Sequence, residues 1–155
     1  MSVVIGVDPG ATSGAIACFV DSELLDAIDM PCTDGIISGA LLAVELREFA
    51  VAGFDSRPTV VIERVHAMPK QGVSSTFKFG RSLGVIEGVI ATLGWPTVWV
   101  TPQAWKKHHG LIGTDKAAAR LRALETWPEH AETFRRKKDG GRADAALIAV
   151  AGGAL

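Results

Sequence analysis

The chain has 155 residues, of which 48% are hydrophobic, and its formal net charge at pH 7 is −1. This length and composition indicate a single globular domain over residues 1–155 and exclude a disordered chain. No apolar run reaches the roughly 18 residues of a membrane-spanning helix, and the first residues do not resemble a secretory signal, so we expect a cytoplasmic protein that binds no membrane. We expect Cys18 and Cys32 to be reduced, with one disulfide between them as the alternative.

The first part of the chain predicts mainly strands. A β-branched run from Val3 to Val7 ends at Asp8-Pro9-Gly10, which indicates a buried strand followed by a turn. Two alternating runs around a turn at Asp21-Ser22 suggest that an antiparallel meander follows. We therefore expect strands at 3–7, 14–20 and 23–29, a helix at 36–52 with Ile37, Leu41, Val44 and Phe49 on its apolar face, and a strand at 59–62.

The second part of the chain predicts mainly helices. A helix over 74–93, with Phe77, Leu83, Ile86 and Ile90 on its apolar face, is followed by a strand at 97–100 and by helices at 102–108, 115–126 and 142–151. Thr114 and Asp115 are candidate N-caps, and residues 128–141 are expected to form a polar, basic loop. The whole pattern indicates an α/β domain with a central five-stranded mixed sheet flanked by helices.

Three acidic residues stand at the ends of predicted elements. Asp8 and Glu63 each follow a strand, and Asp144 lies in the first turn of the last helix. If the two strands are parallel neighbours, these carboxylates meet where open α/β sheets place ligands. Packed carboxylates repel one another, so a divalent cation would stabilise them, and oxygen ligands favour Mg²⁺ or Mn²⁺. Each acid alone could instead cap a helix or pair with an arginine.

The charge of the chain is unevenly distributed. Residues 1–63 carry a net charge of −8, whereas residues 64–142 hold fourteen of the sixteen lysines and arginines and carry +8. A basic segment on a nearly neutral protein is what a localised surface for binding a polyanion requires. Solvated helix faces would give the same pattern.

Four motifs follow one another along nearly the whole chain. They are Ile5-Gly6-Val7-Asp8-Pro9-Gly10 with Ser13-Gly14; Val61-Ile62-Glu63-Arg64-Val65 leading to Lys78-Phe79-Gly80-Arg81 and Leu83-Gly84; Thr101-Pro102 with Lys106-Lys107; and Arg142-Ala143-Asp144-Ala145-Ala146-Leu147-Ile148-Ala149. In this order they resemble the RuvC group of Holliday-junction resolvases, particularly its compact phage-type members. The resemblance implies an RNase H-like (ribonuclease H-like) fold, a homodimer, and nicking of four-way and other branched DNA by two Mg²⁺ ions in a bacterial or phage-infected cell.

The resemblance also implies which residues bind the metal. It makes Asp8, Glu63 and Asp144 the metal-binding catalytic carboxylates. The family usually has a fourth ligand, Asp or His, three residues before the last Asp, where this chain has Gly141. Asp139 is the nearest acid, and the glycine pair that follows it could fold it back toward the site. We therefore include Asp139 as a candidate catalytic and metal-binding residue, with water, or no fourth ligand, as the alternatives.

Candidate DNA contacts follow from the same resemblance and from the basic clusters. His66 stands where the family often has an aromatic residue that stacks on bases. Lysines in this region of the family contact phosphates and assist catalysis, a role that the resemblance implies for Lys106, Lys107 and Lys116, with Lys107 as the candidate catalytic lysine. The predicted set is His66, Lys70, Lys78, Arg81, Lys106, Lys107, Lys116, Arg136, Lys137, Lys138 and Arg142. An ordinary solvated surface is the alternative for each of them.

Two other classes of function stay open. The segment Asp8-Pro9-Gly10-Ala11-Thr12-Ser13-Gly14 also resembles the first phosphate loop of actin-like and sugar-kinase ATPases, although such proteins need a second domain to enclose ATP. The departure at Gly141 would also suit a branched-DNA-binding module without catalysis. Within the nucleases, a junction resolvase and a broader flap or branch nuclease are not distinguished.

Overall fold

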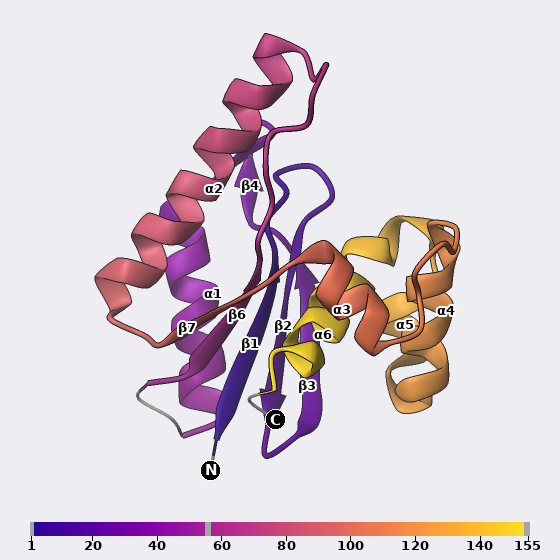
Figure 1. The fold of residues 1–155 in the computed structure, drawn as a ribbon. Coiled ribbons are helices and arrows are strands. Elements are labelled where there is room, and N and C mark those ends of the chain that lie inside the picture. The colour runs from indigo at the N-terminus through magenta and orange to yellow at the C-terminus, as the bar shows by residue number, and fades with distance from the viewer. Residues whose placement is uncertain (1, 55–56, 154–155) are drawn as a thin grey trace.

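The computed structural model describes residues 2–54 and 57–153. Its strands are β1 (Val3–Asp8), β2 (Ala15–Val20), β3 (Glu23–Asp29), β4 (Cys32–Thr33), β5 (Ile36–Ile37), β6 (Thr59–Glu63) and β7 (Thr97–Val100). Its helices are α1 (Gly39–Ala52), α2 (Val73–Leu93), α3 (Pro102–His108), α4 (Ala117–Thr126), α5 (Ala131–Phe134) and α6 (Gly140–Ala151). Five of these strands form one sheet in the order β3-β2-β1-β6-β7 (Figure 1). The structure therefore confirms the predicted α/β architecture with a five-stranded mixed sheet.

The pairing of the strands fixes which residues meet at the end of the sheet. β1 to β3 form the predicted antiparallel meander, whereas β6 runs parallel to β1 and β7 runs parallel to β6. Val7 pairs with Ile62, so Asp8 and Glu63 follow at adjacent positions where β1 and β6 end. This is the parallel arrangement that the sequence required if the two acids were to meet.

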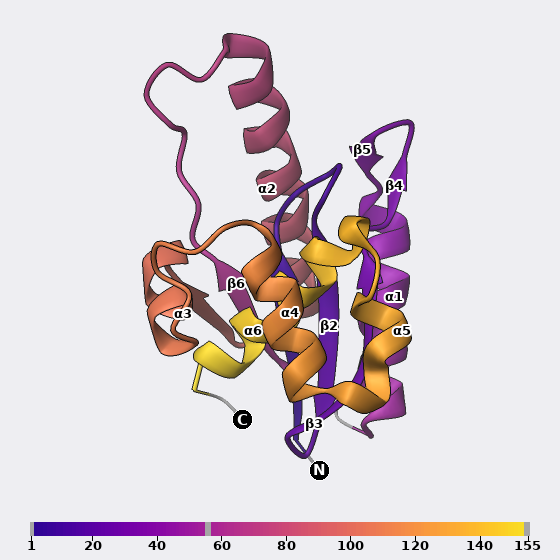
Figure 2. The same cartoon turned by 90° about the vertical axis from the view of Figure 1, so that its right-hand side faces the viewer.

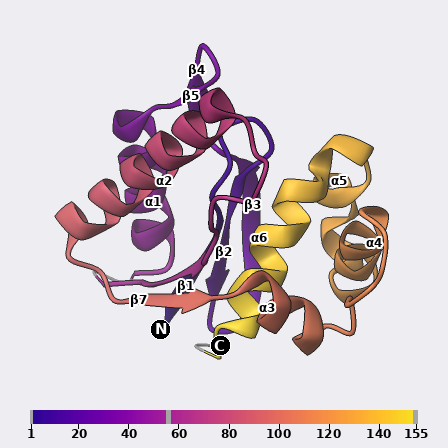
Figure 3. The ribbon, with the colours of Figure 1, turned by 45° about the horizontal axis from the view of Figure 1, so that its top comes forward.

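Helices cover both faces of the sheet. Figure 3 shows α1 and α2 on one face, with α6 on the other and α4 and α5 outside it. β1 alternates between the two layers: Val4 belongs to the core beneath α6, and Val3, Ile5 and Val7 belong to the core beneath α1 and α2. Gly6 is the point of closest approach, because a Cβ there would collide with the Ala145 carbonyl oxygen of α6.

A small hairpin replaces the predicted start of the helix at 36–52. β4 and β5 pair Cys32 with Ile37 around Asp34-Gly35, both of which have positive φ, at 53° and 74°. α1 therefore begins only at Gly39, where the Ser38 hydroxyl oxygen accepts a hydrogen bond from the Leu41 amide. An Asp-Gly pair between short apolar runs is typical of a hairpin. It was overlooked because the apolar residues from Ile37 onward have helical spacing.

The predicted apolar faces of two helices were partly wrong. In α1, Leu42 and Leu46 are buried with Phe49, while Leu41 and Val44 are each 47% exposed. In α2, Ile86 and Ile90 are buried as predicted, but Phe77 is 71% exposed. Phe77 lies in the second turn of α2. The N-terminal turns of α2 project beyond the sheet together with the loop at 64–72 (Figures 1 and 2), away from the core.

The segment at 128–141 is a compact helical connection and not the predicted loop. It contains α5 between two short 3₁₀ turns, Pro128–His130 and Lys137–Asp139, and α6 follows directly from Gly140. Phe134 packs α5 onto the core, since its ring is buried against Trp127 with ring centroids 6.0 Å apart. The basic residues of the segment are thereby held on a folded support.

Among the described residues, none of the helices is both long enough and apolar enough to cross a membrane.

Candidate functional site

The three predicted carboxylates come together at one end of the sheet. Asp8 ends β1, Glu63 ends β6, and Asp144 lies in the second turn of α6. Burial, together with the charges of Asp144 and Glu63, raises the pKa of the Asp8 carboxyl well above its ordinary value. Burial and the charge of Glu63 raise the pKa of Asp144 to about 7. These carboxylates therefore destabilise one another when all are ionised, and a cation would relieve that repulsion.

Two residues of α3 contact or face Glu63. The Nε1–H of Trp105 donates a 2.9 Å hydrogen bond to Oε1 of Glu63, and the Lys106 ammonium lies near enough to act on the charges of Glu63 and Asp144. Burial raises the pKa of Glu63, whereas the Trp105 hydrogen bond and the Lys106 charge lower it. Glu63 is thus the carboxylate of the cluster with the strongest support for its ionised form.

A cavity of about 740 Å³ opens above the cluster. Asp8 and Asp144 line it, and so does Ser13 from the turn after β1. Basic side chains from three other segments complete its wall: Lys106, Lys116, Arg120, Lys137 and Lys138. An acidic floor inside a basic wall can hold cations and a polyanion at the same place.

The carboxylates do not form a finished metal site. In residues 2–54 and 57–153, no three His, Cys, Asp or Glu side chains converge closely enough to hold one ion. The donor set nevertheless suits a hard divalent cation, since it consists of carboxylate oxygens in a half-buried setting. Holding an ion would require the three side chains to move closer together.

The fold leaves no room for a metal-binding side chain at position 141. Its Cα faces the backbone of the turn after β1, and a Cβ there would collide with the Ser13 carbonyl oxygen. That turn is tight, because the Gly14 amide donates to the Gly10 carbonyl at 3.1 Å and the Gly10 amide donates to the Asp8 carbonyl at 3.0 Å. The turn thus occupies the space where a side chain at position 141 would lie.

Asp139 is engaged elsewhere. Its carboxylate accepts hydrogen bonds from the Arg136 amide at 2.8 Å and from the Arg136 guanidinium at 2.9 Å, and it is 1% exposed. Burial alone would raise the pKa of Asp139, but the bonds and charge of Arg136 outweigh it, so this pKa lies below its ordinary value. Asp139 is also not among the residues that line the cavity. This geometry gives no support to its predicted role as a fourth ligand.

The predicted DNA contacts lie in four different settings. Lys106, Lys116, Lys137 and Lys138 line the cavity, whereas Lys107 is exposed on α3 outside it. Arg136 and Arg142 hold carboxylates of the same chain, Asp139 and Asp29, and the Arg142 pair is bidentate at 2.8 and 3.0 Å. The remaining four are exposed on the projecting loop and α2 (Figure 2): His66, Lys70, Lys78 and Arg81.

Sequence reasoning missed three contributors to the site. Ser13 and Arg120 line the cavity, and Trp105 binds Glu63 from a position 42 residues away. The sequence indicated Trp105 only through its position just before Lys106 in a basic cluster.

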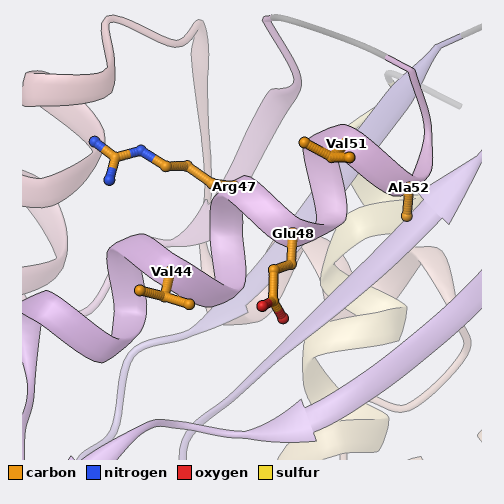
Figure 4. Close-up of a pocket in the computed structure, with 5 residues that line it drawn as sticks. All are labelled: Val44, Arg47, Glu48, Val51 and Ala52. Atoms are coloured by element: carbon orange, nitrogen blue, oxygen red, sulfur yellow. The ribbon is translucent and has the colours of Figure 1, made fainter.

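A separate hollow of about 400 Å³ lies on α1, on the opposite face of the sheet from α6, and is lined by Val44, Arg47, Glu48, Val51 and Ala52 (Figure 4). Glu48 is the one acidic residue in its lining, and the hollow shares none of its lining residues with the cavity beside the carboxylates.

The meander, the parallel β6 and β7, and a helix across the centre of the sheet define an RNase H-like fold. Solved structures of RuvC from Thermus thermophilus share it. RuvC in complex with a Holliday junction substrate is 19% identical, with a TM-score of 0.66, covering 97% of this chain and 92% of that one. A second RuvC structure is 18% identical, with a TM-score of 0.65, covering 96% and 92%. No protein-family model and no curated protein matches the sequence.

Proposed function

We propose that this protein is a RuvC-like, metal-dependent endonuclease that cleaves branched DNA, with the four-way junction as its main substrate and paired symmetric nicks as the result. The observation that carries the proposal is the cluster of Asp8, Glu63 and Asp144 beneath a wall of lysines. The ordered motifs of the sequence support it, as does the fold that the chain shares with a RuvC bound to a junction.

In this proposal the three carboxylates hold Mg²⁺, or Mn²⁺ in its place, as two ions in each active site. Ions bound there would supply an activated water and stabilise the oxygen that leaves the phosphorus. Lys106 interacts with the charges of both Glu63 and Asp144, so it is placed to hold a phosphate against the acids. Asp139, fixed by Arg136, keeps the start of α6 in place instead of binding an ion.

The DNA would lie across the basic wall and the projecting segment. Lys116, Lys137 and Lys138 line the cavity and would contact the phosphates beside the cut, because lysine binds phosphate as a point charge. His66 and Lys70 lie on the loop that follows β6, at the same end of the sheet as the carboxylates (Figure 1). In this proposal the loop enters the centre of a junction.

Symmetric cutting needs two active sites, so the proposal includes a homodimer. The apolar face of α2 that the sequence singled out is largely used within the chain, since Ile86 and Ile90 belong to its own core. Val73 and Phe77 are exposed in the projecting turns of α2, and in this proposal they contact a second copy of the chain. A sedimentation measurement should therefore give a dimer, and Phe77→Ser should shift it toward the monomer.

The function is tested with labelled four-way, flap and linear DNA, each incubated with Mg²⁺ and with EDTA. We expect paired symmetric nicks on the four-way junction with Mg²⁺ and none with EDTA. Glu63→Gln should bind the junction without cutting it. Equal cutting of flaps would instead indicate a broader branch nuclease, and cutting in EDTA would exclude the metal mechanism.

Two rival functions have specific support. The absence of three converging metal ligands among the described residues favours a junction-binding module without catalysis. Such a module would bind junctions equally well with and without Asp8→Asn and would nick none. The tight turn from Asp8 to Gly14 favours an ATPase-like phosphate loop. Hydrolysis of ATP without activity on DNA would establish that alternative.

A further inference from the structure

Trp105 is a buried aromatic residue that reaches from α3 to a carboxylate of the candidate site. It is 2% exposed, and its Nε1–H donates the 2.9 Å hydrogen bond to Oε1 of Glu63. An indole N–H is a donor only, and a buried donor needs an acceptor. In this fold the acceptor is a member of the acidic cluster, so the conformations of Trp105 and Glu63 are linked.

The surroundings of Trp105 hold its ring in place. α3 begins at a capped N-terminus, where the Thr101 hydroxyl oxygen accepts a hydrogen bond from the Ala104 amide at 3.1 Å. The Trp105 side chain packs in the core layer that contains Val100, Leu111 and the alanines of α6. The Lys106 ammonium lies over the ring, 5.5 Å from its centroid. A rigid indole therefore stands between a carboxylate and a cation of the cavity.

We propose that Trp105 is a positioning residue for Glu63: its N–H holds one carboxylate oxygen and leaves the other free to face a divalent cation. This inference rests on the proposed metal-dependent function. A carboxylate fixed by a hydrogen bond keeps the orientation that ligation needs, and loss of such an outer partner typically lowers metal affinity or activity by about 10–100-fold.

The first test compares two substitutions that remove the same chemical group. Trp105→Phe keeps an aromatic ring in the core but removes the N–H. Trp127→Phe is the matched control, because Trp127 is also buried, at 7% exposure, and packs against Phe19 and Phe134. Mn²⁺ affinity, measured by electron paramagnetic resonance of the free ion, should fall by about 10–100-fold in Trp105→Phe and by less than about twofold in the control. Equal affinities in the two variants would overturn the proposal.

The second test needs neither cleavage nor an altered Trp105. The indole N–H signal of Trp105, assigned by triple-resonance nuclear magnetic resonance of the wild-type chain, should move in Glu63→Gln and again when Mg²⁺ is added to the wild-type chain. The indole signal of Trp127 should stay in place. An indole N–H chemical shift of Trp105 that is unchanged in Glu63→Gln would refute the positioning role. This outcome can be read even if Trp105→Phe is too unstable to measure.

These readouts separate this inference from the proposed nuclease activity. If both tests succeed while no DNA is cut, Trp105 positions Glu63 for a metal and the nuclease proposal is wrong. A wild-type chain that binds no Mn²⁺ would overturn both.

Discussion

Asp144 is the single side chain whose ionisation has the clearest consequence for stability. Burial and the charge of Glu63 raise its pKa from 3.8 to about 7. A pKa that is raised on folding means that the native chain holds the proton more tightly than the unfolded chain does. The contribution of Asp144 to the free energy of unfolding is therefore fully present below about pH 4 and is lost as the pH rises through about 7.

Asp144→Asn removes that penalty. Without added metal at pH 8, we expect the variant to exceed the wild type in stability by about 1–3 kcal/mol, or roughly 3–9 °C in Tm, since each pKa unit corresponds to about 1.4 kcal/mol. At pH 4 the two should melt together, because Asp144 is then protonated in the native chain. Thermal melts at both pH values check this, and an equal gain at pH 4 and pH 8 would contradict the electrostatic explanation.

Asp139 provides the contrast, because its bonds to Arg136 give it a structural role. Asp139→Asn should lower stability at pH 7 by about 1–3 kcal/mol, since a buried charged hydrogen bond is lost. The pKa of Asp139 is depressed, so the destabilisation should shrink as the pH falls below about 4. Mn²⁺ affinity should stay within about threefold of the wild type and fall at least tenfold in Asp144→Asn. A comparable loss of Mn²⁺ binding in both variants would restore Asp139 as a ligand.

The contact between α6 and the turn after β1 can be tested with two adjacent glycines. Gly140 and Gly141 both lie in the first turn of α6, but a Cβ at 140 meets nothing within 4 Å, whereas a Cβ at 141 meets the Ser13 carbonyl oxygen. Gly140→Ala should be neutral or stabilising by up to about 1 kcal/mol through helix propensity. Gly141→Ala should destabilise the chain by about 1–3 kcal/mol through overpacking. Urea denaturation measures both, and equal midpoints would show that the turn yields without strain.

The elements show where prediction from sequence succeeds. β1 and β6 are short β-branched runs that end at an acid, and their existence and approximate ends follow from local pattern. Their parallel pairing was only the condition under which the two acids would meet, and the structure satisfies it. The three carboxylates could be placed together on that condition. In contrast, the predicted face of α1 was counted from Ile37, which belongs to β5 and not to the helix, so Leu41 and Val44 were wrongly expected on the buried face.

The rest of the site depends on contacts between distant segments. Gly141 is closed to a side chain by the turn that contains Ser13, and Glu63 is held by Trp105 from 42 residues away. Neither contact has a periodic or local signature in the sequence. Asp139 could not be excluded as a ligand from spacing alone, since its removal from the cluster depends on the 3₁₀ turn that pairs it with Arg136.

The whole molecule separates its charge into regions despite a net charge of only −1. Five basic side chains from α3, α4 and the connections beside them line the cavity, together with Asp8 and Asp144 of the acidic cluster. A polyanion would therefore bind by local neutralisation of its phosphates, with release of counterions and a steep dependence on salt.

Lys137 and Lys138 allow that dependence to be measured away from the carboxylates. If both contact phosphates, the double variant Lys137→Gln/Lys138→Gln should bind a four-way junction more weakly at every salt concentration, and the slope of log K against log [salt] should lose about 1.5–2. Arg47→Gln is the control, since Arg47 lies on α1 (Figure 4), on the face of the sheet opposite α6, whereas residues of α6 line the cavity. It should leave the slope unchanged, because exposed charges farther away than about 10 Å are screened at 0.1 M salt. Fluorescence anisotropy from 50 to 300 mM NaCl gives both slopes. An equal decrease in the two variants would mean that the chain attracts DNA through its overall charge and not through the wall of this cavity.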